Sequence, residues 1–158
     1  MDFNLADFLL DERIREGRGD RVALRIGADT VTYAEVQARA NQYAGYLEDR
    51  GVQPEQRVIL KLPDGLDYVA ALFGILKMGG VVVMVNPELP EHDYQDLLDY
   101  SRAKLAITSP AKVDAFPTTR ENTRTHRDDP ALWIFSGGTT GRPKAAVQSA
   151  TWASWVGR

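Results

Sequence analysis

YVAALFGILKMGGVVVMV, residues 68–85, decides whether the chain contains a membrane span or a buried globular core. A helix needs about 20 apolar residues to cross a bilayer, and this stretch approaches that length. However, Lys77 and the pair Gly79-Gly80 interrupt it. Because paired glycines end a helix, the stretch divides into a buried helix at 66–78 and a buried strand at 81–85. We therefore predict a core helix and strand, and no membrane span.

Strand and helix patterns alternate outward from this stretch. The clearest helix begins with the capping-box pair Thr32 and Glu35 and ends at Gly51. A hairpin turning at Gly27 precedes it. Further strands are expected at 57–62, 103–109 and 131–135, and further helices at 5–16 and 91–101. This alternation predicts an α/β fold in which helices flank a mostly parallel sheet on both faces.

Composition narrows the function classes. The 158 residues form one expected domain, and 19 basic against 22 acidic residues give a net charge of −3. Without a basic excess, nucleic acid is not an expected partner. The chain has no Cys, and its two His are far apart, which argues against a structural zinc site. The N-terminus lacks the features of a secretory signal, so we expect a cytoplasmic protein.

Two polar stretches are interpreted as solvent-facing. Residues 110–130 are charged, contain prolines and show no period, so we expect a surface linker. The acidic run around Asp93, Asp96 and Asp99 does not share one helix face in a metal-ligand arrangement, so a solvated face is the preferred interpretation. His126 lies within the linker and has no catalytic arrangement around it.

The second decisive stretch is WIFSGGTTGRPKAAVQ, residues 133–148, where an apolar strand runs directly into a Gly-rich loop. Glycines allow close approach of the backbone, so several N–H groups can surround an anion. The loop's hydroxyls add donors, Lys144 adds a positive charge, and Pro143 stiffens the exit. The spacing matches neither the Walker loop nor the dinucleotide fingerprint. The alternative is a flexible surface turn with a solvated lysine.

FSGGTTGRPKAAV, residues 135–147, resembles the phosphate-loop signature of the adenylate-forming enzymes, which include acyl- and aryl-CoA synthetases, luciferases and peptide synthetases. The similarity extends over nearly the whole chain, including the helix and strand of residues 31–60 and the segment 67–90. Residues 3–24 and 125–144 are similar to the corresponding regions of the benzoate-CoA ligase branch. The chain thus resembles the N-terminal portion of the large domain of such an enzyme.

The resemblance implies a two-step reaction, in which a carboxylate, here an aryl acid, is adenylated by ATP with Mg²⁺ and then transferred to coenzyme A. The loop would hold the β- and γ-phosphates, a positioning and electrostatic role. Thr139 or Thr140 would supply the hydroxyl on the metal side. The residues implied to contact phosphate are Ser136, Gly137, Gly138, Thr139, Thr140, Gly141 and Lys144.

The sequence also departs from the family pattern. Gly137 stands where a second serine is common, and Ser149-Ala150 stands where many members have a histidine. Family members build the rest of the site from a longer chain, so we expect the chain alone to be inactive. The alternative is a non-catalytic remnant or a nucleotide- or polyphosphate-binding module. Unburied apolar surface around Trp152 and Trp155 would then favour self-association.

Overall fold

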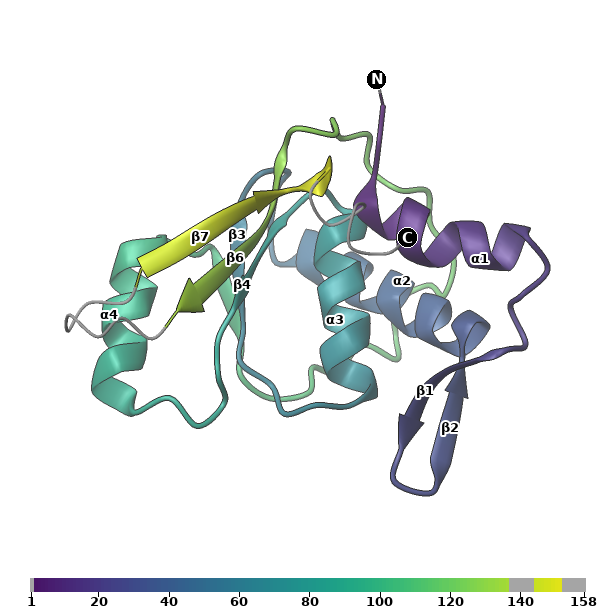
Figure 1. Cartoon of the computed structure of the whole chain (residues 1–158), viewed down its shortest axis with the longest axis horizontal. Helices are drawn as coiled ribbons and strands as arrows, with labels where there is room; N and C mark the ends of the chain where they lie inside the picture. Colours follow the sequence, from purple (N-terminus) through teal and green to yellow (C-terminus); the bar gives the residue numbers. More distant parts are fainter. Residues whose placement is uncertain (1, 137–143, 152–158) are drawn as a thin grey trace.

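The computed structural model describes residues 2–136 and 144–151. A short N-terminal helical segment and a small hairpin precede a five-stranded sheet with helices on both faces (Figure 1). The elements are η1 (Asp7–Asp11), α1 (Glu12–Arg15), β1 (Val22–Ile26), β2 (Asp29–Thr32), α2 (Tyr33–Asp49), β3 (Arg57–Leu60), α3 (Leu66–Lys77), β4 (Val81–Met84), α4 (Glu91–Ser101), β5 (Leu105–Ile107), β6 (Pro130–Ser136) and β7 (Lys144–Ser149).

The main sheet has the strand order β5-β3-β4-β6-β7. Its first four strands are parallel, as their alternation with helices requires, and β7 pairs antiparallel with β6. The predicted fold class, α/β with a mostly parallel sheet flanked by helices, is confirmed. The predicted strands at 57–62, 81–85 and 103–109 are one to four residues shorter in the structure.

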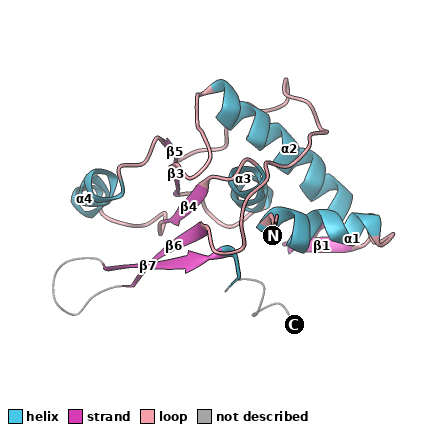
Figure 2. Ribbon diagram, turned by 90° about the horizontal axis from the view of Figure 1, so that it is seen from above, coloured by secondary structure: helices cyan, strands magenta, loops and turns pink. Residues whose placement is uncertain are grey.

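Two apolar clusters cover the two faces of the sheet. Figure 2 shows α4 on one side of the sheet and α3, backed by α2, on the other. Along β3, Val58 and Leu60 join the cluster on the α3 side, while Ile59 joins the cluster beneath α4. This alternation follows from the two-residue period of a strand, which is buried on both faces here.

The helices α2 and α3 pack closely against each other. Gly74 lies directly against α2, where an added Cβ would be 2.7 Å from the Cβ of Tyr43 and 3.0 Å from the carbonyl oxygen of Ala40. The predicted capping box at the start of α2 is present, with the Glu35 amide donating to Thr32 Oγ1 and the Thr32 amide donating to the Glu35 carboxylate. In the part of the chain that the structure describes, no helix is long and apolar enough to cross a membrane.

Residues 110–129 contain no helix and only one isolated β-bridge, between His126 and Asp2. Most of the segment is exposed, but Val113 is fully buried in the cluster on the α3 side. Its last third runs beside the N-terminus, and the Phe3 amide donates to the Thr125 carbonyl at 2.8 Å. The segment therefore contributes to the core as well as to the surface.

Candidate phosphate-binding site

The candidate site lies where β6 ends and β7 begins. β5, β3, β4 and β6 are parallel, so their carboxyl ends meet at one edge of the sheet, which we call the carboxyl edge. In open α/β sheets, ligands bind outside this edge. Ser136 is the last residue of β6 and pairs with Lys144, the first residue of β7. The predicted loop is thus joined to the fold by two paired residues at the edge where ligands bind.

Lys144 has an exposed side chain at this edge. Within residues 2–136 and 144–151, it makes no side-chain hydrogen bond and no ion pair. An exposed ammonium group without a competing carboxylate can attract an anion at little desolvation cost. This is the property expected of a lysine that closes a phosphate-binding loop.

The other residues predicted to contact phosphate are not all within the described part of the chain. For Ser136, the structure gives the backbone pairing alone. Gly137, Gly138, Thr139, Thr140 and Gly141 lie outside the described residues, as does Pro143. Their contacts with phosphate, and the choice between Thr139 and Thr140 as the hydroxyl on the metal side, therefore stay predictions.

Two further polar groups lie at the carboxyl edge. Lys61 follows β3, and its ammonium nitrogen is 5.1 Å from the centroid of the Tyr94 ring on α4. Burial, followed by the charge of Glu91, raises the pKa of Tyr94, so the ring keeps its hydroxyl protonated. Asn86 follows β4 and accepts a hydrogen bond from the Glu88 amide at 2.9 Å. The carboxyl edge thus carries a second cation, Lys61, which makes a cation–π contact with the Tyr94 ring.

The described residues include no group of three or more His, Asp or Glu side chains arranged to hold a metal ion. His92, in the acidic run on α4, is 79% exposed, and its Nε2 is 3.0 Å from Asp93 Oδ1. His126 lies beside the N-terminus and pairs with Asp128. His126 precedes β6 and bridges to Asp2, so it does not lie at the carboxyl edge. His92 lies in the first turn of α4, two residues before Tyr94.

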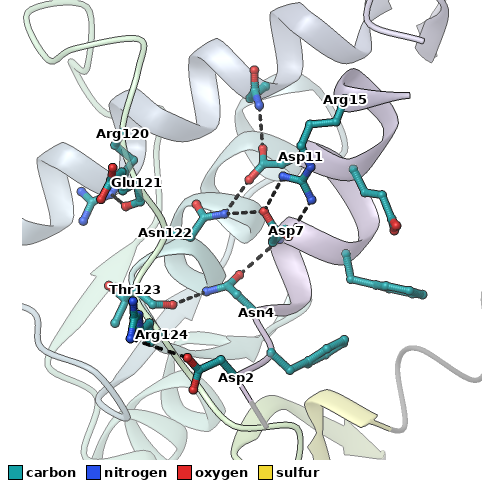
Figure 3. Close-up of a pocket in the computed structure, with 14 residues that line it drawn as sticks. Asp2, Asn4, Asp7, Asp11, Arg15, Arg120, Glu121, Asn122, Thr123 and Arg124 are labelled. Atoms are coloured by element: carbon teal, nitrogen blue, oxygen red, sulfur yellow. Dashed lines mark hydrogen bonds and ion pairs between the residues drawn. The ribbon is translucent and has the colours of Figure 1, made fainter. Parts of the chain in front are cut away.

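A cavity of about 540 Å³ opens at the opposite, amino edge of the sheet (Figure 3). Its walls come from the N-terminal segment and from residues 120–124. Its polar groups bind one another: the Arg15 guanidinium makes two hydrogen bonds of 2.8 Å to the carboxylate of Asp7, and Asn122 donates to Asp11 at 2.6 Å. These mutual bonds leave few groups free for a ligand.

Lys77 lies at the centre of this edge, at the end of α3. Its side chain is 1% exposed, and its ammonium nitrogen is 2.6 and 2.7 Å from the two carboxylate oxygens of Asp11. Burial lowers the pKa of Lys77, while the hydrogen bond and the charge of Asp11 oppose that shift. Gln37 also donates to Asp11, at 2.7 Å. The pair is thus a buried and fully hydrogen-bonded ion pair.

This pair was not predicted from the sequence, where Lys77 was only an interruption of an apolar stretch. A signal was present, because a charged residue within a buried helix must find a partner. Nothing in the sequence designated Asp11, 66 residues away, as that partner.

Comparison with known proteins decides the family. Residues 10–123 match the model of a family described as AMP-binding enzyme. The chain belongs to the AMP-binding enzyme family. The resemblance to adenylate-forming enzymes noted in the sequence is thereby confirmed. The match ends before the loop, so it establishes the family without testing the loop residues.

Among AMP-binding enzymes, the chain is similar to aryl-CoA ligases. It is 29% identical to the benzoate–CoA ligase of Thauera aromatica, over 92% of this chain and 34% of that protein. The structure of a benzoate CoA ligase from Burkholderia xenovorans LB400 superposes with a TM-score of 0.83 at 26% identity, covering 98% of this chain and 36% of the other. An anthranilate CoA ligase, AuaEII, solved with anthranoyl-AMP, gives a TM-score of 0.82 at 25% identity, covering 94% and 35%.

The chain therefore spans about a third of the length of the AMP-binding relatives it matches. It is also shorter within the shared region. The alignment with the Thauera aromatica ligase runs over 177 residues, although this chain has 158 residues in all. The relative thus has residues in the aligned region that this chain lacks.

Proposed function

We propose that the chain forms the N-terminal, polyphosphate-binding part of an ATP-dependent acid–CoA ligase acting on an aryl acid. The single observation that supports this most strongly is the position of Ser136 and Lys144, paired at the carboxyl edge of the sheet of an AMP-binding enzyme. The similarity to ligases of benzoate and anthranilate supports the aryl acid. The substrates, ATP and coenzyme A, follow from the same proposal.

The catalytic contribution of this chain would be electrostatic stabilisation of negative charge on the phosphates. The transfer of an adenylyl group releases pyrophosphate, whose negative charge grows as the bond to the α-phosphate breaks. Lys144 would meet that charge from the end of β7, while the backbone of the loop would surround the phosphates. Mg²⁺ would arrive with ATP and neutralise the phosphate oxygens, with Thr139 or Thr140 on its coordination sphere. Ser136, at the end of β6, would fix the start of the loop.

Titration calorimetry of MgATP into the purified chain tests the proposal. We expect saturable binding, and we expect Lys144→Ala to weaken it by about tenfold or more, because hydrogen bonds to charged groups contribute about 1.5–3 kcal/mol. The matched control is Lys104→Ala. Lys104 is also exposed, but it immediately precedes β5 at the amino edge. The control should bind MgATP as the wild type does.

Equal affinity in wild type and Lys144→Ala would contradict the role of the loop. A second measurement tests whether this chain alone can adenylate an acid. The chain is incubated with benzoate and MgATP, and pyrophosphate release is recorded. We expect binding without release, because the chain spans only about a third of the relatives' length. Release dependent on benzoate would contradict that expectation and would exclude the alternative, a nucleotide- or polyphosphate-binding module without catalysis.

A further inference from the structure

Three segments that are distant in sequence meet at the Lys77 ammonium. Asp11 comes from the N-terminal segment, which we define as residues 2–16. Asn122 comes from residues 122–126, which we call the strap. Lys77 donates to Asn122 Oδ1 at 3.2 Å. Asn122 donates in turn to Asp11 at 2.6 Å (Figure 3). Each segment is therefore bonded to the other as well as to α3.

The side chain of Asn4 repeats this pattern. Its oxygen accepts from the Ala6 amide at 3.0 Å and so caps the start of the N-terminal helix. Its Nδ2 donates to the Leu76 carbonyl at 3.0 Å, at the end of α3, and to the Thr123 carbonyl in the strap at 2.9 Å. The side-chain amide of Asn4 thus forms hydrogen bonds with the start of the N-terminal helix, the end of α3 and the strap. The backbone groups at these two helix ends have no hydrogen-bond partner within their own helices.

The backbone joins the same two segments. The Phe3 amide donates to the Thr125 carbonyl at 2.8 Å, and Thr125 Oγ1 donates back to the Phe3 carbonyl. Asp2 and His126 form an antiparallel bridge. On its other side, the strap is tied to α3, because the Thr123 amide donates to the Lys77 carbonyl at 2.8 Å.

The strap leads directly into the base of the β6–β7 hairpin. A turn follows it, in which the Asp129 amide donates to the His126 carbonyl at 3.0 Å. The end of β7 is fixed to this turn: the Ala150 amide donates to the Asp129 carbonyl at 3.0 Å, and the Thr151 amide donates to the Arg127 carbonyl at 2.8 Å. The position of the hairpin base thus depends on the position of the strap.

We propose that the N-terminal segment and the strap form one latch, which opens and closes as a unit and holds the base of the β6–β7 hairpin. If one segment detaches from the fold, the other loses the hydrogen bonds that they share at Asn122, Asn4 and Phe3. Opening one segment alone therefore breaks all of these bonds but gains the conformational entropy of only one segment. The latch connects the amino edge of the sheet to the strands that carry the loop at the carboxyl edge.

Native-state hydrogen exchange of the wild-type chain, measured at increasing subdenaturing urea, tests the latch without any substitution. The amides of Phe3, Phe8, Thr123 and Ala150 should exchange through one opening, with equilibrium constants that agree within about threefold and the same dependence on urea. The amides inside α2 and β3 should stay protected until a higher urea concentration. Distinct openings for Phe8 and Thr123 would overturn the proposal.

A substitution confined to the strap gives a second test. Asn122→Ala removes the bonds from the strap to Asp11 and Lys77, and should accelerate exchange of the Phe8 amide about tenfold, although Phe8 is in the N-terminal segment. The matched control is Glu121→Ala, at the exposed residue that immediately precedes the strap. It should leave the Phe8 amide as in the wild type. Acceleration confined to the Thr123 amide in Asn122→Ala, or equal acceleration in both variants, would overturn the proposal.

Discussion

Two lysines at opposite edges of one sheet have opposite environments. Lys77, at the amino edge, is buried and held by Asp11 and Asn122. Lys144, at the carboxyl edge, is exposed and has no ion pair among the described residues. A charge is expensive to bury unless it is fully paired, and a charge that must bind a ligand cannot already be paired. The difference separates a lysine that stabilises the fold from the lysine that we propose binds phosphate.

The largest expected difference between the two edges is in the free energy of unfolding when each lysine is replaced by methionine. Lys77→Met leaves the Asp11 carboxylate buried without its cation, and we expect the free energy of unfolding to fall by about 3–5 kcal/mol. Lys144→Met should change it by no more than about 0.5 kcal/mol. Urea denaturation followed by circular dichroism measures both. Similar losses in the two variants would remove the distinction between the edges.

Packing density should differ between the two regions in the same way. Gly74→Ala would force a Cβ to 2.7 Å from the Cβ of Tyr43, so we expect a loss of about 1–3 kcal/mol. Val147, which pairs with Trp133 in the β6–β7 hairpin, is 54% exposed, and Val147→Ala should cost about 0.5 kcal/mol or less. Thermal unfolding of both variants provides the comparison. A Gly74→Ala variant as stable as the wild type would show that the α2–α3 contact can relax.

The helix cap at Thr32 lies outside both edges of the sheet and provides a stability change with which the other variants can be compared. Thr32→Ala removes the acceptor of the Glu35 amide at the start of α2, and we expect it to cost about 1 kcal/mol. The loss should be smaller than that of Lys77→Met and should leave MgATP affinity unchanged. Chemical denaturation and calorimetry on the same sample check the two parts. A changed affinity would mean that α2 communicates with the loop.

The smallest effect concerns the exposed part of the amino edge. The hydrogen bond from Arg15 lowers the pKa of Asp7 below its ordinary 3.8, although partial burial opposes the shift. Because the native pKa is the lower one, this contribution is complete above the ordinary value and is lost as the pH falls through the native pKa. Exposed pairs contribute about 1 kcal/mol at most. Unfolding free energies between pH 5 and about pH 2 should therefore fall slightly less steeply in Asp7→Asn, and a steeper fall would contradict this sign.

Local signals allowed most of the fold to be predicted. The capping box at Thr32 fixed the start of α2, and the glycine pair after Lys77 separated α3 from β4. The five-residue π-helix, η1, within the predicted N-terminal helix was not predicted, because a π turn has no distinct apolar period. The burial of Val113 was not predicted either, since an aperiodic segment gives no indication of which residue faces the core.

The site was predictable in part for the same reason. A strand running into glycines and a lysine is a local pattern, so the position of Ser136 and Lys144 at a strand end could be inferred. Contacts between distant segments, such as Asp11 with Lys77, depend on the tertiary arrangement and have no local pattern. Such contacts create the difference between the two lysines, which therefore became visible only in the folded chain.

The mixed sheet also has a consequence for the order of folding. β6 pairs with β7 through a short connection but with β4 across a long one, since Val82 lies beside Leu132. Closing the long connection costs more chain entropy, so this parallel pairing is the slower step. During synthesis, β3, β4 and β5 emerge before β6 and can assemble first. The loop-bearing hairpin then joins a preformed sheet, which makes its docking a late event in the maturation of the protein.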